Sequence, residues 1–184
     1  MTILTRRKFM QTSLAVGLMP LSIVIKAQSQ SMTSHFNQGE HSMNITETWD
    51  KVFTQSNKVD HRKVTFKNRY GITLAADLYS PKDIQNKLPA IAVSGPFGAV
   101  KEQSSGLYAQ TLAERGFIAL AFDPSYTGES DGTPRNMASP DINTEDFSAA
   151  VDFLGSLNTV NRDEIGVLGI CGFGGFALNA AISD

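Results

Sequence analysis

The chain has one cysteine, Cys171, and it lies in a run of glycines, Gly169-Ile170-Cys171-Gly172-Phe173-Gly174-Gly175. A cysteine thiolate attacks carbonyl carbons readily and forms covalent acyl intermediates. Small residues around a nucleophile permit a sharp turn between a strand and a helix, with strained dihedrals and tight packing. The motif therefore predicts acyl transfer through Cys171. The alternative is that Cys171 is a small buried thiol at a tight strand end.

Acyl transfer also needs two backbone N–H groups aimed at the developing oxyanion. One is predicted to be the amide of Gly172, which directly follows the candidate nucleophile. The second is expected from the loop Ser94-Gly95-Pro96-Phe97-Gly98. Since Pro96 has no N–H, Phe97 is the candidate for this second donor.

Two further glycine motifs lead to different readings. Gly128-Glu129-Ser130-Asp131-Gly132 spells Gly-x-Ser-x-Gly, but loop residues follow where that motif requires a helix, so Ser130 is predicted to be a polar turn residue. Gly172-Phe173-Gly174-Gly175-Phe176-Ala177 fits a dinucleotide-binding fingerprint. That fingerprint needs an acidic residue about 20 positions on, whereas the chain ends at Asp184. Dinucleotide binding is thus a less favoured alternative, and no cofactor is expected.

The strands that position these residues show two patterns. Apolar residues alternate at Val64 and Phe66 and again over residues 72–78, which predicts an antiparallel pair around a turn at residues 68–71. Residues 90–93 and 117–122 are continuously apolar, as is typical of parallel strands covered on both faces. A fifth strand is predicted over residues 165–170.

Three helices are predicted between and after these strands. The first is expected to bury pairs of residues four positions apart and to end at a Gly116 cap, the pairs being Leu107 with Thr111 and Tyr108 with Leu112. The second is predicted to begin near Thr144, and the third to end at Ala181. The alternation of strands and helices predicts an α/β fold with a mostly parallel sheet.

The strand, glycine-rich turn and helix around Cys171 resemble the nucleophile elbow of the α/β-hydrolase superfamily, specifically its dienelactone-hydrolase-like branch. The resemblance covers residues 61–184 and includes the segment Asp123-Pro124-Ser125-Tyr126-Thr127-Gly128-Glu129-Ser130. It implies the N-terminal portion of an α/β-hydrolase fold, with an initial antiparallel hairpin and a truncation after the elbow helix. It also implies hydrolysis of an ester, lactone or thioester of a small-molecule acyl substrate.

The chain departs from that family in two respects. If Cys171 is the nucleophile, the segment from Cys171 to Gly175 is one residue longer than the family's usual nucleophile-x-Gly-Gly. If the glycines are aligned instead, the nucleophile position falls on Phe173, which has no nucleophilic atom. No histidine follows Cys171, only Asp184 could supply a later acid, and His61 precedes the first predicted strand. We therefore expect impaired catalysis, with a non-catalytic binding protein on the same scaffold as the alternative.

Composition excludes several classes of protein. The 184 residues are 41% hydrophobic and 18% charged with a net charge of -2, which gives no basic surface for nucleic acid. One cysteine and three histidines, at positions 35, 41 and 61, offer neither a disulfide nor a zinc-type cluster. No metal is expected.

The N-terminus resembles a twin-arginine export signal. Arg6-Arg7-Lys8-Phe9-Met10 precedes an uncharged apolar stretch over residues 13–25, which Pro20 interrupts. This stretch is shorter than the about 20 residues that span a bilayer, so no stable membrane span is expected after cleavage. We expect an export signal over residues 1–29, a polar linker over 30–60, a partial hydrolase domain over 61–184, and a periplasmic protein.

The predicted fifth strand, residues 165–170, contains no charged residue. If the sheet ends there, its unpaired backbone groups would form an apolar open edge. We therefore expect self-association through this strand.

Overall fold

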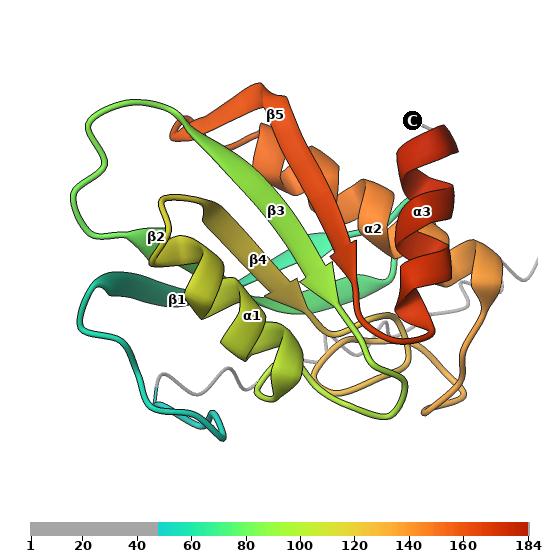
Figure 1. Cartoon of the computed structure of the whole chain (residues 1–184). Coiled ribbons are helices and arrows are strands. Elements are labelled where there is room, and N and C mark those ends of the chain that lie inside the picture. Colours follow the sequence, from blue (N-terminus) through green and yellow to red (C-terminus); the bar gives the residue numbers. More distant parts are fainter. Residues whose placement is uncertain (1–47, 184) are drawn as a thin grey trace, which may run out of the picture. The chain divides into compact units, whose positions relative to one another are not determined.

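The computed structural model describes residues 48–183. The predicted export signal and most of the predicted linker lie outside these residues. The described part contains five strands and three helices (Figure 1), in the order β1 (Val59–Lys67), β2 (Thr73–Pro81), β3 (Leu88–Ser94), α1 (Ser104–Ala113), β4 (Ile118–Phe122), α2 (Pro140–Gly155), β5 (Val160–Gly169) and α3 (Phe173–Ser183).

The five strands form one sheet in the order β1-β2-β4-β3-β5. β1 pairs antiparallel with β2, and β2 pairs antiparallel with β4. β3 pairs parallel with both β4 and β5. The predicted fold class is confirmed. Because β3, β4 and β5 are parallel, the loops that follow them emerge at the same edge of the sheet, where open α/β sheets place their ligands.

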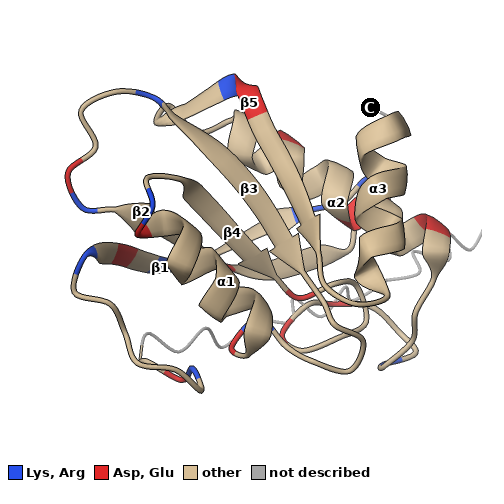
Figure 2. Ribbon diagram, in the orientation of Figure 1, with Lys and Arg blue, Asp and Glu red and all other residues tan. Residues whose placement is uncertain are grey.

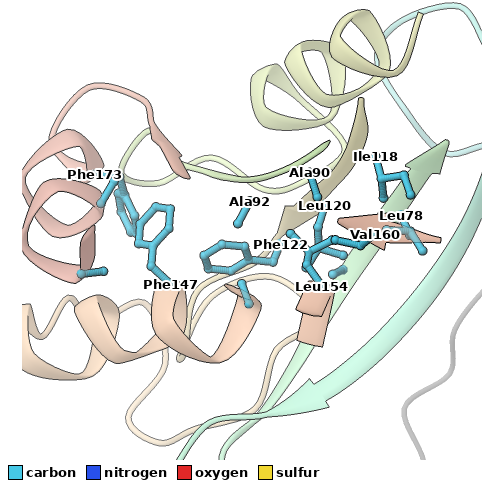
Figure 3. Close-up of a cluster of buried hydrophobic side chains, with 14 residues drawn as sticks. Leu78, Ala90, Ala92, Ile118, Leu120, Phe122, Phe147, Leu154, Val160 and Phe173 are labelled. Atoms are coloured by element: carbon cyan, nitrogen blue, oxygen red, sulfur yellow. The ribbon is translucent and has the colours of Figure 1, made fainter. Parts of the chain in front are cut away.

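Helices cover both faces of the sheet. In Figure 1, α1 lies in front of the sheet and α2 behind it, while α3 lies beside β5 at the right. The core on the side of α2 and α3 includes Phe122, Phe147 and Phe173 (Figure 3). The core on the other face packs small residues of α1, including Ala109, against residues such as Tyr79.

The predicted buried face of α1 is wrong for Leu107 and Tyr108, which are exposed. The buried residues of α1 are mostly small: Ser105, Gly106, Ala109, Gln110 and Ala113. A Cβ at Gly106 would lie 2.3 Å from the Lys101 carbonyl oxygen and 3.1 Å from Tyr79 Oη. The helix therefore lies too close to its neighbours for large side chains. The predicted cap is confirmed, since Gly116 has φ +96° and the amide of Phe117 donates to the Leu112 carbonyl.

Two elements begin earlier than predicted. α2 starts at Pro140. Proline suits the first helical position, because an N–H group there would have no acceptor within the helix. Asn143 Oδ1 accepts from the amide of Ser139, and the amide of Asn143 donates back to the Ser139 carbonyl. β5 starts at Val160 instead of residue 165, and the ladder with β3 is irregular between Leu88 and Ala90.

The early start of β5 corrects a second prediction. The strand includes three exposed charged residues, Arg162, Asp163 and Glu164, so it is not free of charge. Charged side chains on an edge strand disfavour pairing with another chain. Only the second half of β5 has the apolar character that the sequence predicts for the whole strand.

Residues 48–58, within the predicted linker, pack against the domain. Lys51 is buried, Phe53 contacts the core beneath α1, and the amide of Val52 donates to the Glu102 carbonyl at 3.1 Å. Trp49 Nε1 donates to the Phe53 carbonyl at 2.8 Å, and its ring lies 5.3 Å from that of His61. No helix in the described part of the chain is long and apolar enough to cross a membrane.

Candidate active site

Cys171 lies at the apex of the turn between β5 and α3. Its side chain is exposed, and its φ of +57° is in the left-handed region that residues other than glycine rarely adopt. Three backbone hydrogen bonds hold the turn: Ile170 N–H to Ser94 O at 3.0 Å, Phe173 N–H to Ile170 O at 3.2 Å, and Gly174 N–H to Cys171 O at 3.1 Å. Unusual backbone conformations that the surroundings enforce are concentrated at functional sites.

Two glycines of the run make close contacts, Gly169 with backbone atoms and Gly172 with a side chain. A Cβ at Gly169 would lie 2.2 Å from the Phe173 carbonyl oxygen, so the end of β5 touches the start of α3. A Cβ at Gly172 would lie 2.1 Å from Phe97 Cε2. Gly174 and Gly175 are less restricted, since their nearest Cβ contacts are 3.5 Å and beyond 4 Å.

Phe173 and Cys171 differ in burial. Phe173 is only 2% exposed, and its ring points into the core beside Phe147 (Figure 3). The residue at the apex of the turn is Cys171. The structure thus puts a thiol at the apex of the turn and a phenyl ring in the core.

The loop after β3 crosses directly over this turn. Gly95 has φ +96°, and a Cβ there would lie 2.5 Å from the Ile170 carbonyl oxygen. The half-exposed Phe97 ring lies 4.8 Å from the Phe173 ring and 5.7 Å from that of Phe176. Neither the Phe97 amide nor the Gly172 amide donates to another described residue. The two predicted oxyanion donors are therefore on contacting residues and have no internal acceptor within residues 48–183.

Asp123 joins the loop after β4 to the loop after β3. Its buried carboxylate accepts from the Lys101 amide at 2.8 Å, from Lys101 Nζ at 2.9 Å and from the Glu129 amide at 3.0 Å. Gly128 has φ +55°, and a Cβ there would lie 2.2 Å from Asp123 Oδ2. Glycine at position 128 therefore allows the carboxylate to approach the loop backbone.

Lys101 is a fully buried cation with three anionic partners. Its Nζ lies 2.9 Å from Asp123, 2.6 Å from Glu129 and 2.5 Å from Glu102. Burial alone lowers the pKa of Lys101, but these carboxylates raise it above its ordinary value, so the ammonium stays charged. Figure 2 shows acidic residues of this region in red beneath the carboxyl ends of β3 and β4.

Ser130 is confirmed as a turn residue. Its side chain is buried, and its hydroxyl donates to the Asp123 carbonyl at 2.7 Å and accepts from the Ala75 amide at 2.9 Å. The hydroxyl is committed to two backbone groups and faces no solvent. The serine of the Gly-x-Ser-x-Gly sequence thus stabilises the loop that contains Asp123.

A nearby acidic cluster is an ion-pair network. Oxygens of Asp50, Glu102 and Glu129 lie within 4.8 Å of one another. However, Lys63 Nζ lies 2.8 Å from Asp50 and 3.2 Å from Glu129, and Lys101 binds both glutamates. Two ammonium groups already neutralise the carboxylates that a metal would need.

His61 lies far from Cys171. It is inside β1, at the edge of the sheet opposite β5, and its Nε2 is 2.8 Å from Asp77 Oδ1. Four strand spacings of about 4.8 Å separate the two edges by about 19 Å. Lys51 Nζ lies 3.0 Å from the other oxygen of Asp77. No sequence motif links these three residues, and the one local signal of the buried cluster is Asp77, a charged residue within the mostly apolar strand β2.

A family model described as X-Pro dipeptidyl-peptidase (S15 family) matches residues 70–184, which include the turn at Cys171 and the loops bearing Phe97 and Asp123. The chain belongs to this family. The S15-family chain is similar to several longer proteins. It is 68% identical to protein PA2218 of Pseudomonas aeruginosa over 159 residues. The matched region covers 85% of this chain and 43% of PA2218.

Two more relatives extend this comparison. Protein YcjY of Escherichia coli is 46% identical over 128 residues (67% of this chain, 42% of the relative). A protein named thiohydrolase from Eupenicillium brefeldianum is 32% identical over 123 residues (67% of this chain, 39% of the relative). The S15-family chain thus spans about two fifths of the length of these curated relatives.

Solved structures agree with the fold. The crystal structure of PA2218 has a TM-score of 0.75 at 72% identity, covering 77% of this chain and 44% of that one. The α/β hydrolase GrgF from Penicillium sp. sh18 has a TM-score of 0.63 at 30% identity, covering 68% and 42%. The S15-family chain has an α/β-hydrolase fold, and its relatives are hydrolase-like proteins.

Proposed function

We propose that Cys171 is the nucleophile of an acyl-transfer reaction that cleaves an ester, lactone or thioester of a small-molecule acid. The observation that carries this proposal is the exposed Cys171, held at φ +57° between β5 and α3. The neighbouring amides of Phe97 and Gly172 support it, since they have no acceptor among the described residues. The relative named thiohydrolase supports the thioester as one substrate type.

The reaction begins when the deprotonated sulfur of Cys171 attacks the carbonyl carbon and forms a C–S bond. The carbonyl π electrons move to oxygen, and the amides of Phe97 and Gly172 stabilise that charge. When the carbonyl re-forms, the bond to the leaving alcohol or thiol breaks, and the leaving group takes up a proton in place of the one that the thiol lost. The acyl group is then a thioester on Cys171, which water hydrolyses to release the acid and the thiol.

We further propose that this chain is acylated faster than it is deacylated. Hydrolysis of the thioester needs a base that activates water. Within residues 48–183 the one imidazole belongs to His61, in the strand at the opposite edge of the sheet, and the two edge strands are about 19 Å apart. We therefore propose that the chain alone turns over slowly. We also propose that it belongs to the dienelactone-hydrolase-like branch, which the sequence motifs indicate.

Export to the periplasm by the twin-arginine pathway is a separate proposal. It depends on the residue types of positions 6–29, which lie outside the described residues. Paired arginines ahead of a short apolar stretch are the part of such a signal that its receptor reads.

The proposed nucleophile is tested by trapping the acyl adduct. The chain is mixed with p-nitrophenyl butyrate, and a burst of one equivalent of p-nitrophenolate and a matching mass increase on Cys171 are expected. Cys171→Ala should abolish both, whereas Ser130→Ala should retain them, because the Ser130 hydroxyl is bonded to backbone groups. Absence of an adduct on a Cys171 that iodoacetamide still alkylates would contradict the proposal and favour a non-catalytic binding protein.

A further inference from the structure

We propose that Asp123, through its buried ion pair with Lys101, positions the loop that carries the Phe97 amide and so sets the strength of the oxyanion site. This inference rests on the proposed function. Asp123 is assigned as a positioning residue, since it acts through the loop and touches no substrate.

The first support is the set of donors that the Asp123 carboxylate binds. Lys101 donates from both its amide and its ammonium, at 2.8 and 2.9 Å, and the Glu129 amide donates at 3.0 Å. Hydrogen bonds to an ionised group are about twice as strong as neutral ones. Because the donors come from the loops after β3 and β4, one carboxylate fixes both loops relative to each other.

The second support is the short path from Lys101 to Phe97. Only three residues separate them. Two backbone hydrogen bonds form turns here: the Ala99 amide donates to Pro96 O at 3.2 Å, and the Gln103 amide donates to Val100 O at 3.0 Å. A displacement of Lys101 is therefore transmitted to the Phe97 backbone through this short segment.

The other end of the loop is fixed independently. The Ser94 hydroxyl donates to the Phe122 carbonyl at 2.9 Å, and Gly95 packs against the Ile170 carbonyl oxygen. The Phe97 amide thus lies between two anchors, of which the second depends on Asp123. Oxyanion donors act only when they are already placed before the charge develops, so the anchors matter for rate.

The third support is the cost of the arrangement. Both side chains of the Lys101 and Asp123 pair are fully buried. Burying two charges requires removing their bound water, which costs more free energy than burying two apolar side chains of similar size. Such a pair alone is therefore a poor source of stability. Gly128, with its left-handed φ, leaves room for the carboxylate. We infer that the pair is kept for the loop geometry that it enforces.

The experiment compares two reactions of the same thiol. Acylation of Cys171 by p-nitrophenyl butyrate passes through an oxyanion, whereas alkylation by iodoacetamide is a displacement that forms none. Asp123→Asn places an amide NH2 against donors, so the acylation rate constant should fall about 10- to 100-fold, below the about 100- to 1,000-fold loss of a whole donor. The alkylation rate constant should stay within about twofold of the unaltered chain.

Two other variants complete the experiment. Glu129→Gln removes one carboxylate charge beside Lys101 at a partly exposed position, and it should lower the ratio of acylation to alkylation about threefold even if Asp123→Asn does not fold. Asp152→Asn is the control, since Asp152 is an exposed carboxylate of α2 that lies outside the ion-pair network of Lys101 and Lys63. It should leave the ratio unchanged.

The outcomes separate the inference from the function on which it rests. If the unaltered chain is not acylated at Cys171, the proposed function fails and the inference fails with it. If the unaltered chain is acylated but both variants keep its ratio, the inference alone is overturned. An equal loss of acylation and alkylation would show a general structural effect and would also overturn it.

Discussion

The Phe97 ring packs so closely on Gly172 that a Cβ at position 172 would lie 2.1 Å from Phe97 Cε2. The two residues whose amides are the proposed oxyanion donors are therefore in direct contact. A side chain at position 172 would therefore force the Phe97 ring to turn away.

Gly172→Ala should displace the Phe97 ring. We expect a loss of about 1 kcal/mol in the free energy of unfolding, at the low end for overpacked sites because the half-exposed ring can turn, together with slower acylation of Cys171. Gly175→Ala is the matched control, because a Cβ there meets nothing within 4 Å and α3 gains a better helix former, worth up to about 1 kcal/mol. Thermal unfolding of the two variants measures the difference, and equal stability would contradict the prediction.

Lys51→Met should be strongly destabilising. Lys51 Nζ lies 3.0 Å from Asp77 Oδ2, and both side chains are fully buried. Removing one partner of a buried pair costs about 3–5 kcal/mol when the other charge is left uncompensated. The loss here should lie toward the lower end of that range, because His61 Nε2 still lies 2.8 Å from Asp77 Oδ1. Urea unfolding should show that loss, whereas Lys58→Met, at an exposed lysine of the same segment, should change stability by less than about 0.5 kcal/mol.

The fold should lose stability in acid through carboxylates near the N-terminal segment. Burial raises the pKa of Asp77, but His61 and Lys51 outweigh it and hold the pKa below the ordinary 3.8. Burial likewise raises the pKa of Asp50, and hydrogen bonds from Lys51 and Lys63 lower it further than burial raises it. A lowered carboxyl pKa adds stability that is fully present above the unfolded value and is lost as pH falls through the folded value.

The free energy of unfolding should therefore decrease below about pH 4. Asp50→Asn should be less stable than the unaltered chain at pH 7, and the difference should shrink as the pH approaches about 2. Chemical denaturation at several pH values measures it. A difference that is constant over this range would show that Asp50 does not contribute through its charge.

Self-association through β5 remains a proposal, now restricted to the second half of the strand. Among the described strands, β5 pairs only with β3, and its charged residues lie in its first half. Gly166→Lys places a charge on the apolar half at a position where a Cβ meets nothing within 4 Å. Sedimentation should show dimers of the unaltered chain and monomers of Gly166→Lys. Gly175→Lys, equally unhindered but on α3, should remain dimeric, and a fully monomeric unaltered chain would refute the proposal.

Export is tested separately from the fold. Replacing Arg6 and Arg7 with lysine keeps the positive charge and removes the pair that the twin-arginine receptor reads. The precursor should then accumulate in the cytoplasm, as cell fractionation can show. Normal periplasmic levels of this double variant would exclude the twin-arginine pathway.

The sequence predicted the strands and the strand-helix alternation because apolar periodicity directly reports which faces are buried. It failed for α1, where Leu107 and Tyr108 are exposed and Gly106 is buried. There, the close approach of the helix to Lys101 and Tyr79 determines the buried face, and this depends on tertiary contacts. The early start of α2 has a local signal in Pro140, since proline favours the first helical position.

The site shows the same division. The glycines around Cys171 predicted a sharp turn because each missing side chain is a local constraint. The pair of Lys101 and Asp123 is separated by 22 residues, and neither residue belongs to a motif that would reveal its partner. Buried ion pairs leave no periodic pattern in the sequence, so only the three-dimensional structure reveals how the Phe97 loop is anchored.

Trp49 is the one tryptophan of the chain, and it is stacked edge-on against Phe53 and His61. Its emission therefore reports whether residues 49–53 are docked on β1, at the edge of the sheet opposite Cys171. Fluorescence and thiol labelling then observe the two edges of one sheet separately. Transitions that coincide in a denaturant series would show that both edges unfold as one cooperative unit.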